Sequence, residues 1–471
     1  MQYVKRFFHP APSDAASPVS QSQRISIIDT VRGFALLGIL MMNIPFFADA
    51  PQRSDNIHVY NETSGINFYT WLTVDGAFEG TMRALFSLLF GAGTILLLSR
   101  LEKRQIPNFT PADIFYRRLF VLLAFGLINA FVLLWPGDIL YGYALCGLFL
   151  YPFRNWKAKN LLIVGIALML FCNFKETRQW YRNKQIRVKG ETALQLQNKK
   201  VTLTETQQTD LKKWQDYHEK RKPENLQKEV QKEREAMRSS NWFSVYEHLR
   251  PTTVKFESTQ VYLSWFWDAI ALFFLGMALF KWGVLTAERS NRFYLILLLV
   301  GYGLGFGINY FIMKAKMDPG MNGTKYFDRF FVNLYQERRL LQALGHMSLI
   351  MLFYKNKVFS FLWKWLSRVG QMAFSNYLMQ SIICTWLFYG FGFGLFGKLE
   401  RYQWYIVVLS VWVFQIIFSN IWLYYFRFGP FEWLWRSVTY WKKQPMRRKQ
   451  EQPEQPELIP QPVPLEIVPG K

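Results

Sequence analysis

The chain consists largely of apolar runs long enough to cross a lipid bilayer, and short basic stretches separate them. Residues 293–312 and 405–426 are two such runs, and Trp, Tyr and Phe collect near the ends of the runs. A hydrocarbon core of about 30 Å needs roughly 20 helical residues, and aromatic rings favour the headgroup level at its edges. The sequence therefore predicts an all-α fold, a polytopic membrane helix bundle.

About ten segments are candidate spans, and this number is good to about one because the third, fourth and fifth are short. A tight reversal is predicted at residues 135–138, which join two of these short spans. The ten segments are residues 25–48, 76–98, 119–135, 139–153, 160–174, 261–279, 293–312, 330–354, 371–391 and 404–426.

Basic residues in the short loops predict the orientation, because cytoplasmic loops carry an excess of Lys and Arg. These residues precede the first span and fill alternate loops after it, whereas residues 51–75 hold only Arg53 against several carboxylates. The alternation fits a cytoplasmic N-terminus and, with an even number of spans, a cytoplasmic C-terminus. One loop, before the eighth span, dissents: it would lie outside yet carries Lys314, Lys316, Lys325 and Arg329.

Composition along the chain divides it into five regions. They are a cytoplasmic N-terminal segment (1–24), an N-terminal membrane half of about five spans (25–174), a charged helical extracytoplasmic insert (175–258), a C-terminal membrane half of about five spans (259–441), and a disordered cytoplasmic tail that is first basic and then Pro-rich (442–471). A long loop crosses the membrane largely regardless of its charge, so the many lysines of the insert do not contradict an outside location.

Two segments outside the spans have helical patterns of their own. Residues 209–237 of the insert are predicted to form one solvated helix with Trp214 and Tyr217 on one side. Residues 431–441 form an aromatic amphipathic stretch, which should lie in the inner membrane interface with its tryptophans as anchors.

Charge and cysteine usage exclude several classes of protein. The formal net charge of +23 is assigned to membrane topology and not to a nucleic-acid partner, because many basic residues lie in short loops between apolar runs. Cys146, Cys172 and Cys384 lie inside apolar runs without CxxC or zinc-ligand spacing, so we expect no disulfide and no metal site. Residues 1–23 lack an apolar h-region, so the first span should direct insertion. The glycine-rich run 301–307 suits close helix packing better than phosphate binding.

Two pairs of ionisable residues lie inside the first two spans, where an unpaired charge costs about 2.5–3.5 kcal/mol on insertion scales. Asp29 and Arg32 are three residues apart, so they share a helix face and can pair. This pair is either a helix-end ion pair with a topological role or part of the polar lining of an inner cavity. Glu79 and Arg83 are four apart and are expected to pair as well, either facing a cavity or as a lone structural salt bridge.

Other charged groups lie in later spans. Asp138, with Tyr141 behind it, is placed at the outer mouth of the fourth span, and Asp268 lies within the sixth. The adjacent Arg338 and Arg339 of the eighth span point about 100° apart, so at least one should face protein or water. A guanidinium there could bind a carboxylate, a phosphate or an aspartate of another helix.

Histidines and amides complete the set of intramembrane and loop candidates. His346 in the eighth span is either a helix–helix hydrogen-bond partner or a base, and Asn376 and Gln380 in the ninth suit interhelical hydrogen bonding. His58 is the histidine placed at the outer mouth near several carboxylates. It is either an inert loop residue or the catalytic base.

Several motifs resemble one family of bacterial membrane proteins. Residues 24–40 (RISIIDTVRGFALLGIL), continuing to Asn43, resemble the opening of YeiB-like proteins, and residues 83–93 (RALFSLLFGAG) and 137–145 (GDILYGYAL) resemble two further signatures. From Gly345-His346 through NYLMQS (376–381) to GPFEWLWR (429–436), the C-terminal half is similar to domain-of-unknown-function family 418. The resemblance covers nearly the whole chain except the insert and the tail.

The resemblance implies a place in the transmembrane acyltransferase superfamily, which includes heparan-α-glucosaminide N-acetyltransferase. In that group an acyl donor, commonly acyl-CoA, is used from the inner side and a sugar is acylated outside. It also implies a multi-pass protein of the bacterial cytoplasmic (inner) membrane with no permanently bound cofactor. A loop histidine serves the heparan enzymes just ahead of a stretch that residues 72–75, ending at Asp75, resemble; here residues 69–71 hold no histidine, and His58 is the nearest upstream.

The leading functional hypothesis is an O- or N-acyltransferase acting on an envelope glycan or lipid. Asp29, Arg32, Glu79 and Arg83 would line a polar conduit, and Arg338 or Arg339 would hold an anionic group. The candidate catalytic residues are His58, Glu79, Arg83 and Asp138. The candidate substrate-binding residues are Asp29, Arg32, Asn43, Asp75, Tyr141, Asp268, Arg338, Arg339, His346, Asn376 and Gln380.

Two other hypotheses stay open. The same buried charges could relay protons or bind a solute in a transporter or lipid-handling protein, although no inverted repeat is visible in the sequence. The chain could instead be a scaffold whose insert binds an envelope partner. The expected partners are the lipid bilayer, acyl-CoA and a glycan or lipid acceptor, with no nucleic acid. The oligomeric state is open, a homodimer included.

Overall fold

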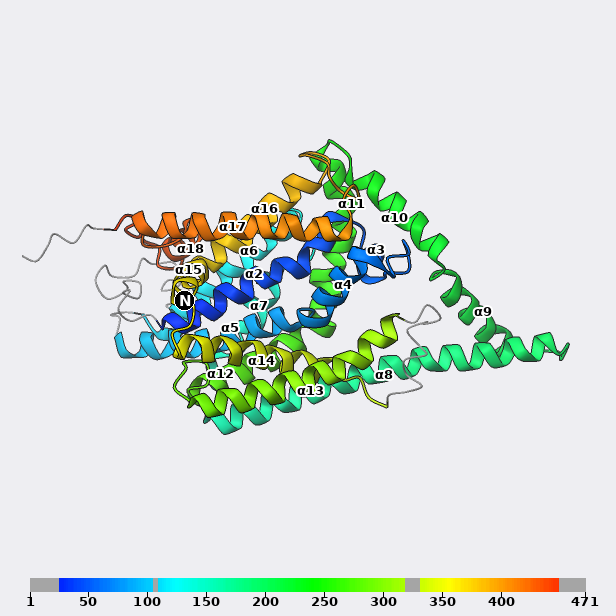
Figure 1. The fold of residues 1–471 in the computed structure, drawn as a ribbon, viewed down its shortest axis with the longest axis horizontal. Coiled ribbons are helices and arrows are strands. Elements are labelled where there is room, and N and C mark those ends of the chain that lie inside the picture. The colour runs from blue at the N-terminus through cyan, green and yellow to red at the C-terminus, as the bar shows by residue number, and fades with distance from the viewer. Residues whose placement is uncertain (1–24, 105–108, 318–330, 449–471) are drawn as a thin grey trace, which may run out of the picture.

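The computed structural model describes residues 25–104, 109–317 and 331–448, and the fold of these residues is all-α (Figure 1). Their one β-type pairing is an isolated bridge between Phe426 and Arg447. Most helices run side by side along the long axis of the molecule, as the apolar runs predict. The N-terminal segment 1–24 and the Pro-rich end of the tail lie outside the described residues.

The helices have the following bounds. They are α2 (Ser26–Ala48), α3 (Pro51–Asp55), α4 (Gly65–Ala77), α5 (Thr81–Arg104), α6 (Pro111–Phe131), α7 (Leu140–Gly147), the short 3-10 turn η2 (Tyr151–Phe153), α8 (Ala158–Asn198), α9 (Glu205–Glu219), α10 (Pro223–Met237), α11 (Trp242–Lys255), the π-helical η3 (Phe256–Trp265), α12 (Phe266–Lys281), α13 (Asn291–Met317), α14 (Tyr335–Lys355), α15 (Ser360–Gln371), α16 (Ala373–Phe388), α17 (Arg401–Tyr425) and α18 (Pro430–Thr439).

Seven helical stretches of the described chain are long and apolar enough to cross a membrane. They are Ser26–Ala48, Gly65–Lys103, Pro111–Phe131, Ala158–Asn198, Trp242–Lys281, Asn291–Met317 and Arg401–Tyr425. The chain is thus a multi-pass membrane protein.

Three of the ten predicted spans are not among these seven, and the total number of spans stays a prediction. The segment 139–153 is the 8-residue α7 followed by η2, and 371–391 contains the 16-residue α16. The segment 330–354 corresponds to α14, whose first turns carry several charged residues. Its first residue, 330, lies outside the described chain.

Several basic loop residues lie together at one end of the bundle. The end where α2 begins is here called the N-terminal side. There, basic residues of one loop contact residues of neighbouring loops. Arg154 Nε lies 2.7 Å from Glu102 Oε1, Lys281 Nζ lies 2.7 Å from the Arg154 carbonyl oxygen, and Lys355 Nζ lies 3.0 Å from that of Ala287. The alternate basic loops therefore gather on one side, as the topology argument requires.

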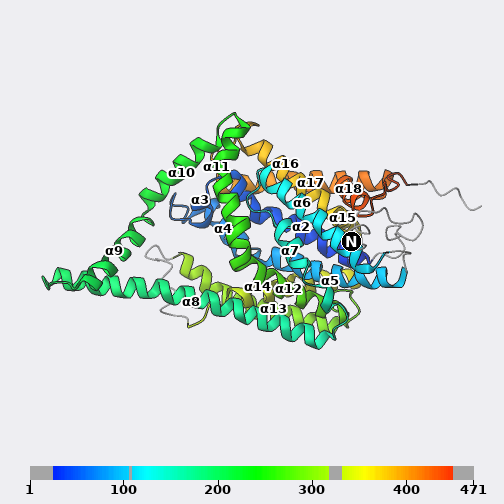
Figure 2. The same ribbon diagram turned by 180° about the vertical axis from the view of Figure 1, so that it is seen from behind.

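The opposite end, here called the insert side, carries the helices that project from the bundle (Figures 1 and 2). Helix α8 is one continuous helix of 41 residues that runs from within the bundle far beyond it, and α9 and α10 return to the bundle. The boundary predicted at residue 175 is therefore not a break in the chain's structure.

The predicted single helix 209–237 is wrong, because the chain turns after α9 and Pro223 begins α10. Proline is well tolerated at the first position of a helix but interrupts a helix interior. Trp214 is buried against α8, where a Cβ on Gly190 would lie 2.1 Å from the Trp214 Cβ, and its ring stacks on Tyr217 at 5.7 Å.

The aromatic stretch 431–441 forms α18, as its pattern predicts, but two of its tryptophans are partly buried in protein. Trp433 Nε1 donates to the Gln444 carbonyl oxygen at 2.7 Å, and Trp435 Nε1 donates to that of Arg118 at 2.9 Å. These bonds fix the start of the basic tail against the N-terminal side of the bundle.

Close helix packing depends on small residues, as the glycine-rich run predicts. A Cβ on Gly301 of α13 would lie 2.6 Å from the Leu341 carbonyl oxygen of α14, and one on Gly305 would lie 2.8 Å from Gln342 Cγ. By contrast, a Cβ on Gly303 would meet nothing within 4 Å. One face of the run therefore supports the α13–α14 contact and the other faces open space.

This contact generates a matched pair of variants. Gly301→Leu should push α14 away and lower the free energy of unfolding by about 1–3 kcal/mol, as overpacking does. Gly303→Leu should leave stability near wild type, because its side chain points away from the bundle. Thermal unfolding in detergent micelles measures both. Equal losses in the two variants would show that α13 does not pack through this face.

Candidate functional site

A cavity of about 290 Å³, here called the main cavity, lies between α2, α5, α6, α7, α16 and α18. Its walls are mostly apolar side chains, including Phe86, Leu89, Phe90, Leu119 and Leu122. Along α5 it extends from Phe86 to Leu101, so it follows the helix toward the N-terminal side of the bundle.

The mouth of the main cavity on the N-terminal side is rich in guanidinium groups. Arg32, Arg100, Arg118 and Arg436 all line it, against the carboxylates of Asp29 and Glu432. Arg118 lies 3.7 Å from the centre of the Trp435 ring, which holds it in place. The excess of guanidinium over carboxylate makes this mouth suited to an anion.

The predicted pair of Asp29 and Arg32 is present, with Nη1 and Oδ1 2.7 Å apart. Its position at the mouth supports the cavity-lining interpretation. Close packing of α2 on α15 places it there, since a Cβ on Gly370 would lie 1.8 Å from the Asp29 carbonyl oxygen. Glu432 is already engaged, because it accepts from the backbone N–H groups of Phe374 and Ser375 at 2.8 and 3.0 Å, the start of α16.

The deep end of the main cavity leads to a buried carboxyl group. Tyr377, which lines the cavity, accepts a hydrogen bond from Ile139 N at 3.2 Å and donates to Asp138 Oδ1 at 3.4 Å. Asp138 also accepts from Asn129 Nδ2 at 2.8 Å and from Tyr141 N at 2.9 Å. Asp138 is 0 % exposed, so protein encloses its side chain on all sides.

Tyr143 stands beside this group. Its hydroxyl lies 2.5 Å from Ser87 Oγ of α5, and its ring lines the main cavity. The sequence motif 137–145 pointed to this turn. Tyr377, which lies in the NYLMQS motif, and Asn129 of α6 complete the site, and no spacing in the sequence indicates that they contact Asp138.

A second polar centre lies toward the insert side. Glu79 pairs with Arg338, while Asp268 pairs with both Arg83 and Arg339. Both arginines of α14 are buried at 1–2 % exposure, so both face protein, and the expectation that at least one would do so is confirmed. Three helices, α5, α12 and α14, are thus tied together by one carboxylate.

The predicted pairing of Glu79 with Arg83 is wrong. Helix α4 ends at Ala77 and α5 begins at Thr81, and Gly80 between them has φ +70°. The two residues therefore do not lie on one continuous helix, so four-residue spacing does not bring them together.

The four charged residues of the predicted conduit do not share one chamber. Asp29 and Arg32 line the main cavity, whereas Glu79 and Arg83 belong to the second polar centre and are not among its lining residues. The reason is that the two pairs lie at opposite ends of the bundle. Asp29 and Arg32 are at the start of α2 on the N-terminal side, and Arg83 is at the start of α5, which runs in the opposite direction.

Neither histidine candidate approaches Asp138 or the main cavity. His58 Nε2 lies 3.2 Å from the Lys316 carbonyl oxygen on the insert side. Both ring nitrogens of His346 are occupied, Nδ1 by Tyr302 Oη at 2.8 Å and Nε2 by the Ala77 carbonyl oxygen at 2.9 Å. His346 therefore acts as a hydrogen-bond partner that joins α14 to α13 and α4.

The remaining candidates hold helices together. Asn376 Nδ2 donates to Ser419 Oγ at 2.9 Å, and Gln380 Nε2 donates to Gln415 Oε1 at 3.1 Å, which joins α16 to α17. Asn43 is partly buried in α2. Asp75 forms an ion pair with Lys316 at 2.7 Å, which compensates one charge of the loop that dissented from the topology rule.

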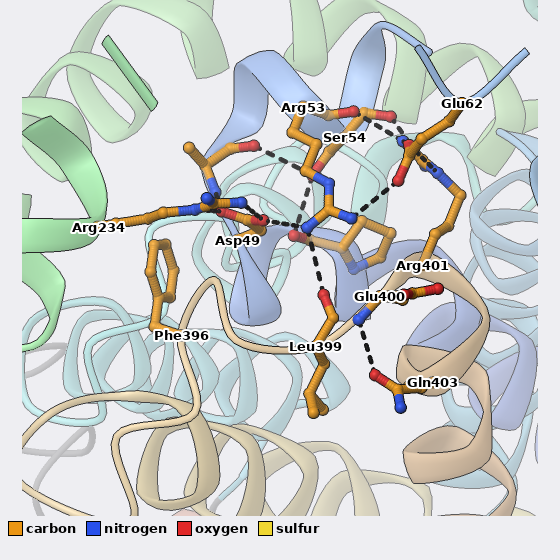
Figure 3. A network of polar contacts seen from close by, with 12 residues as sticks. Asp49, Arg53, Ser54, Glu62, Arg234, Phe396, Leu399, Glu400, Arg401 and Gln403 are labelled. Atoms are coloured by element: carbon orange, nitrogen blue, oxygen red, sulfur yellow. Dashed lines mark hydrogen bonds and ion pairs between the residues drawn. The ribbon is translucent and has the colours of Figure 1, made fainter. Parts of the chain in front are cut away.

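An ion network on the insert side joins the insert to the bundle (Figure 3). Arg53 lies between Asp49 at 2.7 Å and Glu62 at 2.8 Å, and Arg234 of α10 reaches Asp49 at 2.6 Å. Arg401 completes the network, with Nη2 2.7 Å from Glu62 Oε2. The sequence did not indicate this network, because its members lie in polar segments that are far apart in the chain.

Burial would raise the pKa of Asp49, but the hydrogen bonds from Arg234 and Arg53 outweigh it, and the pKa lies below the ordinary value of 3.8. The stabilisation from Asp49 is therefore present above pH 3.8 and is lost as the pH falls through the folded-state pKa.

This geometry predicts acid release of the insert. The protection of the α10 amides against hydrogen exchange, measured relative to the intrinsic rate at each pH, should be high at neutral pH and fall below pH 3.8. Asp49→Asn should accelerate the exchange already at neutral pH, because breaking a buried pair costs about 3–5 kcal/mol. Glu219→Gln, at an exposed pair with Lys222, is the control and should change nothing. Unchanged α10 exchange in Asp49→Asn would contradict the role of the network.

The second polar centre predicts a large loss of stability in Asp268→Asn. This change leaves the guanidiniums of Arg83 and Arg339 buried without their shared carboxylate, at a cost of about 3–5 kcal/mol. Thermal unfolding in micelles measures it. Asp113→Asn, at the exposed cap of α6, serves as control and should cost only about 1 kcal/mol. Equal effects would mean that Asp268 is not a structural anchor.

Comparison with known proteins places this geometry in a family. The family described as "Protein of unknown function (DUF418)" matches residues 279–442. The chain is 33% identical to the "Uncharacterized protein YxaH" of Bacillus subtilis (strain 168) over 448 residues, covering 92% of this chain and 98% of the relative. It is 29% identical to the "Uncharacterized protein YeiB" of Escherichia coli (strain K12) over 434 residues, covering 88% and 96%.

A third relative, the "Uncharacterized 39.9 kDa protein in amylase 3'region" of Bacillus acidopullulyticus, is 25% identical over 440 residues, covering 92% of this chain and 99% of the relative. No solved structure matches the chain. The similarity to YxaH and YeiB extends over nearly the full length of all three proteins, well beyond residues 279–442. The chain therefore belongs to the YeiB-like DUF418 family of membrane proteins.

Proposed function

We propose that this protein is an integral membrane acyltransferase that moves an acyl group from an anionic thioester donor, such as acyl-CoA, to an envelope glycan or lipid. The observation that carries the proposal is the main cavity, which joins an arginine-rich mouth to a buried carboxyl group through apolar walls. An acyl donor has the same order of parts, since its phosphates are anionic and its acyl chain is apolar.

The size of the main cavity fits part of such a donor. Ligand pockets range from about 300 to 1,000 Å³. A volume of about 290 Å³ accommodates an acyl chain and its thioester arm, while the phosphates would stay at the mouth. Arg32 and Arg118 are the residues proposed to hold them, because guanidinium groups bind phosphate oxygens in a bidentate manner.

Asp138 takes the role of base in this proposal, in place of His58. The acceptor hydroxyl or amine attacks the thioester carbonyl, a new C–O or C–N bond forms, and the C–S bond breaks. The acceptor's proton passes to the Tyr377 hydroxyl oxygen while the Tyr377 proton passes to the Asp138 carboxylate, and the reverse relay delivers a proton to the leaving thiolate, so no proton or charge is left over. The Tyr143 hydroxyl at the deep end is a donor for the oxyanion that develops on the carbonyl oxygen.

The orientation proposed for the protein follows from its basic loops. Because the alternate basic loops gather on the N-terminal side, this side is proposed to face the cytoplasm, with both termini inside. The mouth of the main cavity then opens to the cytoplasm, where acyl-CoA is made. YxaH and YeiB come from bacteria, so the membrane is proposed to be the bacterial cytoplasmic membrane.

Binding and turnover of acyl-CoA by the purified protein test this function. Arg118→Gln should weaken binding of a fluorescent acyl-CoA about tenfold or more, since loss of one charge-assisted contact costs about 1.5–3 kcal/mol. Asp138→Asn should keep the binding and lose hydrolysis or transfer. Arg292→Ala, at an exposed arginine outside the cavity, is the matched control and should behave as wild type.

The outcomes separate the alternatives. If no acyl-CoA binds, or if Arg118→Gln binds it as tightly as wild type does, the proposal fails. A mass comparison of envelope glycans and lipids between deletion and complemented strains identifies the acceptor through a missing acyl increment. Uptake of a solute into proteoliposomes without an acyl donor would instead support the transporter hypothesis.

A further inference from the structure

Glu257 is a buried carboxyl group without a hydrogen-bond partner among the described residues. It lies in η3 and is 5 % exposed, and neither of its carboxyl oxygens has a donor in the described chain. The helix α11 that leads into η3 runs across the bundle, whereas most helices run along it (Figure 2). Segments of π-helix are rare and occur frequently at functional sites.

Packing of η3 on α7 brings Glu257 close to the carboxyl group at the deep end of the main cavity. A Cβ on Gly142 would lie 3.8 Å from Val261 Cγ1, and the hydroxyls of Tyr141 and Tyr262 are 2.8 Å apart. Asp138 is the charged group that acts electrostatically on Glu257. Two acidic groups therefore share one region that is largely closed to water.

The groups around the two acids are uncharged. From α6 comes Asn129, from α7 Tyr141, from α16 Tyr377 and from η3 itself Tyr262. Cys146 of α7 donates to the Phe266 carbonyl oxygen at 3.6 Å.

The basic groups that contact η3 lie further along it. Lys175 of α8 donates to the Leu263 carbonyl oxygen, and the Arg83 guanidinium lies 4.3 Å from the centre of the Trp265 ring. Arg83 is moreover paired with Asp268. These two basic groups thus lie at the far end of η3, and Lys255, which directly precedes η3, is exposed.

We propose that Glu257 holds a proton and forms, with Asp138, a proton-storing carboxyl pair at the deep end of the main cavity. An isolated carboxylate buried without donors costs so much free energy that the group takes up a proton instead. Asp138 accepts three hydrogen bonds, from Asn129, Tyr141 N and Tyr377, which stabilise its carboxylate. The negative charge therefore belongs to Asp138 and the proton to Glu257.

The surroundings connect this pair to the main cavity. The Tyr377 hydroxyl donates to Asp138 and lines the cavity. Asp138 meets Tyr141 through the backbone N–H of Tyr141, whereas the Tyr141 hydroxyl pairs with that of Tyr262. The hydroxyl path for a proton therefore runs from Asp138 through Tyr377 to the cavity.

The proton on Glu257 does not depend on the proposed acyl transfer. If transfer does occur, the pair deepens that proposal, because a stored proton near Asp138 would be available to the leaving thiolate. Spectroscopy of the carboxyl group tests the pair, and acyl-CoA turnover tests the reaction. The two can therefore fail separately.

Infrared spectroscopy of the purified protein tests the proposal directly. At pH 7 the wild-type protein should show a band of protonated carboxylic acid that shifts in D₂O, and Glu257→Gln should lack the part due to this residue. Glu247→Gln is the matched control, because Glu247 lies on α11, is exposed and pairs with Arg250 at 3.5 Å. Its spectrum in this region should equal that of the wild type.

Three results would overturn the proposal. They are the absence of any protonated-acid band in the wild type at pH 7, an unchanged band in Glu257→Gln, and an equal loss in Glu247→Gln. Should Glu257→Gln fail to fold, Glu257→Asp keeps the acid and should shift the band without removing it. An unshifted band in Glu257→Asp would count against the proposal.

Discussion

The structure depends on pairing charges between helices that are distant in the chain. A carboxylate or guanidinium inside a bundle is tolerated where an opposite charge meets it, since each unpaired charge costs several kcal/mol. Asp268 shows the principle, because it binds one arginine from α5 and another from α14. Removing one partner leaves the others buried and uncompensated, so such centres fix the relative positions of whole helices.

The balance between acidic and basic side chains differs between the Figure 3 network and the mouth of the main cavity. On the insert side, Asp49 and Glu62 each contact two guanidiniums, so the charges of the Figure 3 network compensate one another and join α10 to the bundle. At the mouth of the main cavity four arginines meet two carboxylates, and one of these, Glu432, is already bound to the start of α16. Arginines therefore outnumber carboxylates among the residues that line the mouth, and this is the feature on which the proposed binding of an anionic donor rests.

Sequence reasoning found the seven stretches that are long and apolar enough to cross a membrane, and one pair that lies within a single helix. The pair of Asp29 with Arg32 follows from three-residue spacing within one helix, and the packing face of α13 follows from spaced glycines. Sequence reasoning failed where an interruption between two helices changed the positions of residues four apart. Gly80 separates Glu79 from the helix of Arg83, and no pattern in the sequence indicates that Arg338 of α14 is the true partner.

The same limit explains why Glu257 was overlooked. It stands at the end of a long charged insert, and charged runs in a sequence usually belong to solvated faces. The fold buries it in a segment that packs on α7 through contacts such as Val261 with Gly142, between residues more than a hundred positions apart. Asp138 and Glu257 are both buried carboxyl groups, yet among the described residues three donors contact Asp138 and none contacts Glu257. Hydrogen bonding, which the sequence does not reveal, thus decides which of the two carries the charge.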